Sequence, residues 1–264
     1  MPDDLNQWTP ARSWPTFVVL TALLIWIAHA IAFFAHEYAH STLAWLLGWK
    51  ANPLALNYGH LTPSNLLAQF DIDENVNYAP IFAAGHTYQA GLIAAAGVAL
   101  GNGLITYPLS LWALATSKRH NARTWAMLSY WLLVASVGNF LCYVPVRIFS
   151  PRADMHTAAL GFNCSPWWIL LVLGLPFGLA LVHFLMQIEP RSLRWLLPNA
   201  PARRSVLVIL TAFAIFGFYG AAGWSSGVVS HRLSATSVYL FAPLMMLVGW
   251  LLTNRTQVSW RETQ

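Results

Sequence analysis

Residues 14–49 read WPTFVVLTALLIWIAHAIAFFAHEYAHSTLAWLLGW. The stretch is long enough to cross a bilayer, because about 20 predominantly apolar residues span the hydrocarbon core. Its only carboxylate and imidazole side chains are those of His29, His36, Glu37 and His40. Ionisable side chains are costly at membrane depth, so their presence there indicates a functional site. The stretch therefore predicts a transmembrane helix with a polar centre.

Residues 36–40 of this helix form the pattern H-E-x-x-H. Side chains four positions apart lie on one face of a helix, about one turn from each other. His36 and His40 can therefore bind one Zn²⁺ ion, and Glu37 can act on a water at that ion. A catalytic zinc has three protein ligands, so another ligand must come from elsewhere in the chain. The alternative, two interior histidines bonded to neighbouring helices, explains neither the spacing nor Glu37.

The rest of the chain has the composition of a membrane protein. Of its 264 residues, 57% are hydrophobic and 9% are charged, whereas soluble domains carry about 25% charged residues. Cys142 and Cys164 have no C-x-x-C partner, which speaks against a thiolate metal site or a disulfide framework. We predict an all-α, polytopic transmembrane helix bundle of about six spans, at 15–47, 80–115, 125–149, 167–186, 206–222 and 237–252.

These spans suggest a division of the chain into three parts. Residues 1–14 are expected to form an N-terminal segment, residues 15–160 a catalytic membrane core of three spans, and residues 161–264 a C-terminal region of three spans. Residues 50–77, between the first two spans, are too polar to cross the bilayer. They form either an ordinary solvated loop or a hairpin or re-entrant loop that packs against the site.

The net charge is +5, and the basic residues lie in short segments between the predicted spans. This distribution is typical of the positive-inside rule, and it does not indicate nucleic-acid binding. Of the 14 basic residues, ten fall on the side of the termini and four on the other side, namely Lys50, Arg147, Arg152 and Arg232. The bias predicts cytoplasmic termini in a multi-pass protein of a bacterial inner membrane or an equivalent membrane.

The candidates for the third ligand are Asp71, Asp73, Glu74, His86, Asp154, His156 and Glu189. Asp154 has the most suggestive surroundings, because it follows a span that contains Asn139 and is interrupted by Pro145 and Pro151. Prolines break regular helical hydrogen bonding, which lets a side chain turn inward. Asp154 is therefore the first choice and His156 the second. His29 and His86 are candidates for contacts around the site.

An H-E-x-x-H helix followed by a helix with Asn139, Pro145 and Asp154 in that order resembles the site-2-protease family of intramembrane zinc metalloproteases. Residues 94–103, AAAGVALGNG, resemble the Gly- and Asn-containing helix between the two motifs of that family. The resemblance covers residues 31–158. Independently of the family, Gly97 and Gly101 form a G-x-x-x-G face that predicts close helix packing.

The resemblance implies a fold, an activity and a set of site residues. His36, His40 and Asp154 would be the ligands of Zn²⁺, and Glu37 would be the general base. Asn139 would hold the substrate strand or the developing oxyanion. The substrate would be a transmembrane protein in the lipid bilayer. Many members of the family place the site near the cytoplasmic face, which conflicts with the charge bias, so the orientation stays open.

Three other functions are alternatives to the protease. Met155 stands where the family has Gly, and the spacings among Asn139, Pro145 and Asp154 are longer, so a catalytically inactive, protease-like membrane scaffold or chaperone is the main alternative. A di-iron desaturase needs several histidine boxes, but the chain has one histidine pair at this spacing. A transporter needs a polar path through the later spans, where His183 and Gln187 are the main polar residues. The substrate and the oligomeric state do not follow from the sequence.

Overall fold

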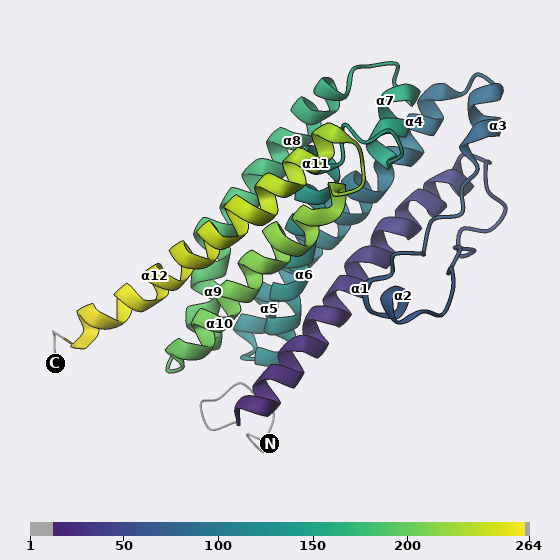
Figure 1. Cartoon of the computed structure of the whole chain (residues 1–264). Helices are drawn as coiled ribbons and strands as arrows, with labels where there is room; N and C mark the ends of the chain where they lie inside the picture. Colours follow the sequence, from purple (N-terminus) through teal and green to yellow (C-terminus); the bar gives the residue numbers. More distant parts are fainter. Residues whose placement is uncertain (1–12, 262–264) are drawn as a thin grey trace.

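The computed structural model describes residues 13–261, with side chains described through Thr253. The described chain is helical and contains no strand, apart from one isolated antiparallel bridge between Asn57 and Asp73. The long helices run side by side along an elongated bundle (Figure 1). The predicted all-α bundle is therefore confirmed.

Six helices of the described chain are long and apolar enough to cross a membrane, as predicted. The first is α1 (Trp14–Leu46), and the second joins α4 (Thr87–Ala96) through a π-helical segment (Gly97–Thr106) to α5 (Tyr107–Arg119). The third joins α6 (Arg123–Leu141) to a π-helical segment (Cys142–Val146). The fourth span joins α8 (Pro166–His183) to α9 (Glu189–Leu196). The fifth consists of α10 (Pro201–Ala212) and the short helical segments that continue it to Gly223. The sixth joins α11 (Val228–Thr236) to α12 (Ala242–Arg261).

Three predicted boundaries differ from the structure by seven or more residues. The second span begins at Thr87 instead of 80, because α3 (Tyr78–Ala83) is a separate short helix. The fourth span continues to Leu196 instead of ending at 186, because a π-helical segment (Phe184–Ile188) precedes Pro190 and lets the helix continue past it. The sixth span begins at Val228 instead of 237. Its first turns contain Ser230 and Ser234, which lower the mean hydropathy of this stretch. Both serines are buried against the protein, so these turns can belong to a span without exposing polar side chains to lipid.

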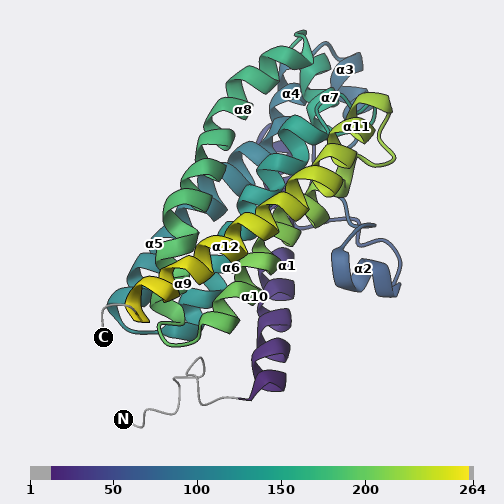
Figure 2. The ribbon, with the colours of Figure 1, turned by 60° about the vertical axis from the view of Figure 1, so that its left-hand side comes forward.

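Helix α6 forms the centre of the bundle. It contacts α1, α5, α8 and the π-helical segment that follows α4. Its side chains include several that are almost fully buried, namely Met127, Tyr130, Trp131 and Leu133. Helices α8 and α12 lie on the outside of the bundle (Figure 2) and expose large apolar side chains, as lipid-facing helices do, among them Val172, Leu175, Leu179, Leu244 and Leu247.

The segment between the first two spans folds back along α1. Its short helix α2 (Pro63–Ala68) lies beside the middle of α1 (Figure 2), where the indole of Trp26 donates a hydrogen bond of 3.1 Å to the carbonyl of Leu66. The ammonium group of Lys50 donates to three carbonyls and ties the two ends of the segment together. The segment thus folds back on α1 instead of extending away from it, and we call it the re-entrant segment; its depth in a bilayer stays a prediction.

Different elements lie at the two ends of the bundle. The start of α1 and the end of α12 lie at one end, whereas α3 (Tyr78–Ala83), the start of α4 and α7 (Asp154–Gly161) lie at the other (Figure 1). Residues 36–40 are in the half of α1 nearer to α7. The two ends of the described chain therefore share one side, as an even number of spans requires, and the cytoplasmic assignment of that side stays a prediction.

Candidate metal centre

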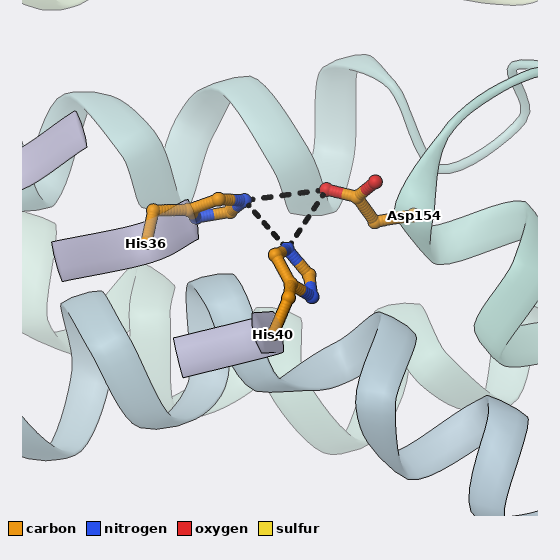
Figure 3. Close-up of side chains that lie close together, drawn as sticks. All are labelled: His36, His40 and Asp154. Carbon is orange, nitrogen blue, oxygen red and sulfur yellow. Dashed lines mark hydrogen bonds and ion pairs between the residues drawn. The ribbon is translucent and has the colours of Figure 1, made fainter. Parts of the chain in front are cut away.

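Three candidate ligands meet between α1 and the first turn of α7 (Figure 3). The Nε2 atoms of His36 and His40 are 3.1 Å apart, and both face Oδ2 of Asp154, at 3.2 and 3.5 Å. The histidines are almost completely buried, and the Asp154 side chain is 25% exposed. The structure thus brings Asp154, the first choice for the third ligand, to the predicted histidine pair.

The outer ring nitrogens of both histidines have defined partners. Nδ1 of His36 is 2.9 Å from Oδ1 of Asn102, whose amide nitrogen donates to the carbonyl of Ala32. Nδ1 of His40 donates to the carbonyl of Ile93 at 2.6 Å. Because both partners of the Nδ1 atoms are acceptors, each Nδ1 carries a proton. In the neutral rings, the Nε2 atoms therefore present lone pairs to one another and to Asp154.

Three acceptors at these distances need a proton or a cation between them. Burial opposes the ionisation of Asp154, but a proton on the facing Nε2 atom of His36 or His40 outweighs it and lowers the pKa of its carboxyl below the usual range. Two imidazole nitrogens and one carboxylate oxygen, with ligand atoms within 4.8 Å of one another, match the donor set of catalytic zinc sites. The group could hold a metal ion, which would displace the shared proton.

Gly97 leaves the space that such an ion needs. A Cβ atom at this position would lie 2.2 Å from Nε2 of His40 and 2.4 Å from Nε2 of His36. One turn later, a Cβ atom at Gly101 would lie 2.4 Å from the carbonyl oxygen of Ala35. The close helix packing predicted from the G-x-x-x-G spacing is therefore present, and Gly97 in addition faces both candidate ligands.

We expect Gly97→Ala to weaken zinc binding about tenfold or more, because overpacking a tight contact costs about 1–3 kcal/mol. Competition with a chromogenic chelator measures the affinity, and thermal unfolding reports the fold. Gly178→Ala is the matched control, since a Cβ atom at this helical position meets nothing within 4 Å. Zinc binding of Gly97→Ala at wild-type strength would contradict the proposed ion position.

A break in the third span places Asp154. Pro145 lies in the π-helical segment that ends α6, and the helix stops at Arg147. After an irregular stretch, α7 begins at Asp154 and packs on α4. The packing is close, because a Cβ atom at Gly161 would lie 2.3 Å from the backbone nitrogen of Gly91. The interrupted helix therefore turns Asp154 toward α1, as the prolines suggested.

Glu37 and the re-entrant segment complete the surroundings of the three ligands. Glu37 is buried, with 6% of its surface exposed. Burial first, and then the negative charges of Glu74 and Asp154, raise the pKa of Tyr78 far above its usual range. The Tyr78 hydroxyl donates to Glu74 at 3.1 Å, and the Ser41 hydroxyl donates to the carbonyl of Pro53. The segment thus covers the same end of α1 as the candidate ligands.

Three other candidate residues, Asn139, His29 and His86, have partners other than the three ligands. Asn139 is buried in α6, and its amide nitrogen donates to the carbonyl of Ala135 in the same helix. His29 bonds through Nδ1 to the Tyr219 hydroxyl at 2.8 Å rather than to His36, so it does not support a ligand. His86 lies at the start of α4, where its ring packs against Trp49.

The other candidates for the third ligand also lie outside the group. His156 is in α7, two residues after Asp154, and does not belong to the cluster of possible metal ligands. Asp71, Asp73 and Glu74 belong to the re-entrant segment, where Asp73 accepts a hydrogen bond from the side chain of Asn57. Among the described residues, His36, His40 and Asp154 form the one group suited to a metal ion.

Asn102 and Tyr143 are contacts that the sequence analysis did not assign. The ring of Tyr143 stacks on that of His36, with centroids 4.2 Å apart. In the sequence, Asn102 stands out only as part of the small-residue run 94–103. A fully buried amide between two glycines in an apolar span was the signal, because a buried amide needs hydrogen-bond partners.

We expect Asn102→Ala to weaken zinc binding about 10–100-fold, because loss of an outer contact frees the tautomer and orientation of a ligating imidazole. Isothermal titration with zinc measures the change. Asn139→Ala removes an amide of the same size from another span and should leave the affinity unchanged, since Asn139 bonds to its own helix. Equal affinities of the two variants would show that Asn102 does not position His36.

The fold and the site together define a class of protein: a multi-pass helical membrane protein with a buried His-His-Asp group that could hold a metal ion. Comparison with protein-family models, curated proteins and solved structures found no match.

Proposed function

We propose that the protein is an intramembrane zinc metalloprotease that hydrolyses peptide bonds of membrane-embedded substrates. The observation that carries the proposal is the convergence of His36 and His40 on Asp154, with both Nδ1 atoms held by acceptors. Glu37 follows His36 in the same helix and is buried. Two oriented imidazoles, a carboxylate and a neighbouring second carboxylate are the groups that zinc-dependent hydrolysis requires.

Each residue has a defined task in this proposal. His36, His40 and Asp154 would hold the zinc ion. When bound, the ion would polarise the scissile carbonyl and lower the pKa of a water molecule. Glu37 accepts a proton from the attacking water and passes it to the leaving amine nitrogen as the peptide C–N bond breaks. Asn102 and the carbonyl of Ile93 hold the two imidazoles in the tautomer that leaves both Nε2 atoms free.

The substrate has to meet conditions set by the membrane. A transmembrane helix satisfies its backbone hydrogen bonds internally, so it must unwind before its peptide bond reaches the site. We therefore expect helix-weakening residues near the scissile bond. One N–H of the Asn139 amide donates to the carbonyl of Ala135, so the other N–H would hold the substrate strand or the oxyanion. That task for Asn139 rests on the family resemblance.

The test uses the full chain in liposomes together with a fluorogenic transmembrane peptide that has glycines near its centre. We expect the peptide to be cleaved, 1,10-phenanthroline to stop cleavage, and added zinc, but not magnesium, to restore it. A parallel preparation measures bound zinc. Bound zinc without cleavage of such peptides would favour the inactive scaffold. Absence of bound zinc, after the purification has been shown to be free of chelators, would overturn the proposal.

A further inference from the structure

A second polar feature lies at the opposite end of the bundle from the metal centre. A cavity of about 350 Å³ opens between α9, α10 and α12, close to the end where α1 starts and α12 finishes (Figure 1). The function proposed above makes no use of it. Its inner part is apolar and is lined by residues of three helices, among them Leu185, Met186, Val208, Met245 and Val248.

The outer part of the cavity carries two arginines, Arg194 from α9 and Arg204 from α10. The Nε atom of Arg204 is buried and has no hydrogen-bond partner. In the part of the chain that the structure describes, the ion pairs with a carboxylate are those of His36 and His40, so neither arginine is neutralised in this way. Two unpaired guanidinium groups at one cavity create a local positive field that attracts an anion.

The cavity also contains a carboxyl group without a full set of partners. Glu189 lines it and is 9% exposed, and its Oε1 atom is buried with no hydrogen-bond partner. A buried carboxyl oxygen normally finds a donor, because leaving it unsatisfied costs about 1–3 kcal/mol. The cavity thus offers two guanidinium groups, one carboxyl oxygen without a hydrogen-bond donor, and an apolar chamber.

We propose that this cavity binds an anionic glycerophospholipid whose head group carries hydroxyls. The phosphate lies between Arg194 and Arg204, a head-group hydroxyl donates to Glu189, and an acyl chain fills the apolar chamber. Guanidinium groups suit a phosphate because their N–H groups match its oxygens in pairs. The two arginines are positively charged, and the negatively charged phosphate of the head group complements them.

The position of the cavity supports a lipid over a free anion. Basic pockets between transmembrane helices at one membrane face are typical sites for anionic head groups. Other cationic side chains surround the same end: Lys118 donates to the Ser192 hydroxyl, and Arg123 lies over the ring of Trp195. A free phosphate would satisfy the arginines but leave the apolar chamber empty.

The test measures lipid binding by native mass spectrometry of the full chain in detergent, with phosphatidylglycerol, phosphatidylethanolamine and phosphatidylcholine of equal acyl composition. We expect phosphatidylglycerol to bind about tenfold or more tightly than the other two lipids, the effect of one additional charge-assisted hydrogen bond. Inorganic phosphate in millimolar excess should not displace it. Equal binding of the three lipids would overturn the proposal, and displacement by phosphate would reduce the cavity to a site for free anions.

Variants then locate the site. Arg194→Gln combined with Arg204→Gln should reduce phosphatidylglycerol binding to the level of phosphatidylcholine. Arg119→Gln combined with Arg191→Gln is the matched control, because it removes two positive charges from exposed positions that do not line the cavity. Ala212→Leu keeps both arginines but fills part of the chamber, and should weaken binding of all lipids. Unchanged preference in the double variant, or equal loss in the control, would assign the binding to the bundle surface.

Discussion

Wild-type protein is expected to contain about one zinc ion per chain, and His40→Ala and Asp154→Ala are each expected to lose it. Either substitution removes one of the three ligand atoms that meet in Figure 3. In either variant two protein ligands remain, whereas a catalytic zinc site needs three. Inductively coupled plasma mass spectrometry of detergent-purified protein measures the metal directly, without any assumption about a substrate.

His156→Ala is the control for this experiment. It removes a side chain of the same helix as Asp154, but one that lies outside the ligand group, so zinc should be retained. Loss of zinc in His156→Ala together with its retention in Asp154→Ala would transfer the third ligand to His156. Retention in all three variants would place the metal elsewhere in the protein.

Glu37→Gln is expected to keep its zinc and to cleave the transmembrane peptide about 10²–10⁴-fold more slowly, the usual contribution of a positioned acid–base group. The amide has the size of the carboxylate but cannot accept the proton of the attacking water. The initial rate in liposomes, divided by the zinc content of each preparation, separates the chemical step from metal loss.

Glu74→Gln is the matched control for Glu37→Gln. Glu74 is another carboxylate near the site, where it accepts a hydrogen bond from Tyr78, and the proposal gives it no part in proton transfer. We expect this variant to retain most of its cleavage rate. Cleavage by Glu37→Gln at the wild-type rate would show that Glu37 is not the general base.

Parts of the site that depend on local geometry could be predicted from the sequence. His36 and His40 share a face because the helix repeats every 3.6 residues, and this holds wherever the helix is placed. Asp154 lies 118 positions after His36, so helix periodicity does not predict their contact. The sequence indicated the contact through the prolines that interrupt the third span and through the family resemblance. The break at Pro145 did occur, and it turned the chain back toward α1.

Other contacts of the site were beyond sequence reasoning. Gly97 and Asn102 lie on a span that could have turned any face toward α1. Close packing chose the face that puts Gly97 against both imidazoles and Asn102 beside Nδ1 of His36. His29 illustrates the reverse, because its spacing from His36 suggested a contact, but the bundle gave it Tyr219 as a partner.

The sequence by itself determined the class of fold, the six spans and the histidine pair, because each follows from hydropathy or from the period of one helix. The tertiary structure decided the third ligand, the tautomers of the two imidazoles, the course of the re-entrant segment and the cavity at Arg194 and Arg204. These features depend on contacts between segments far apart in the chain. Such contacts are decided by how the helices pack, which no short stretch of sequence encodes alone.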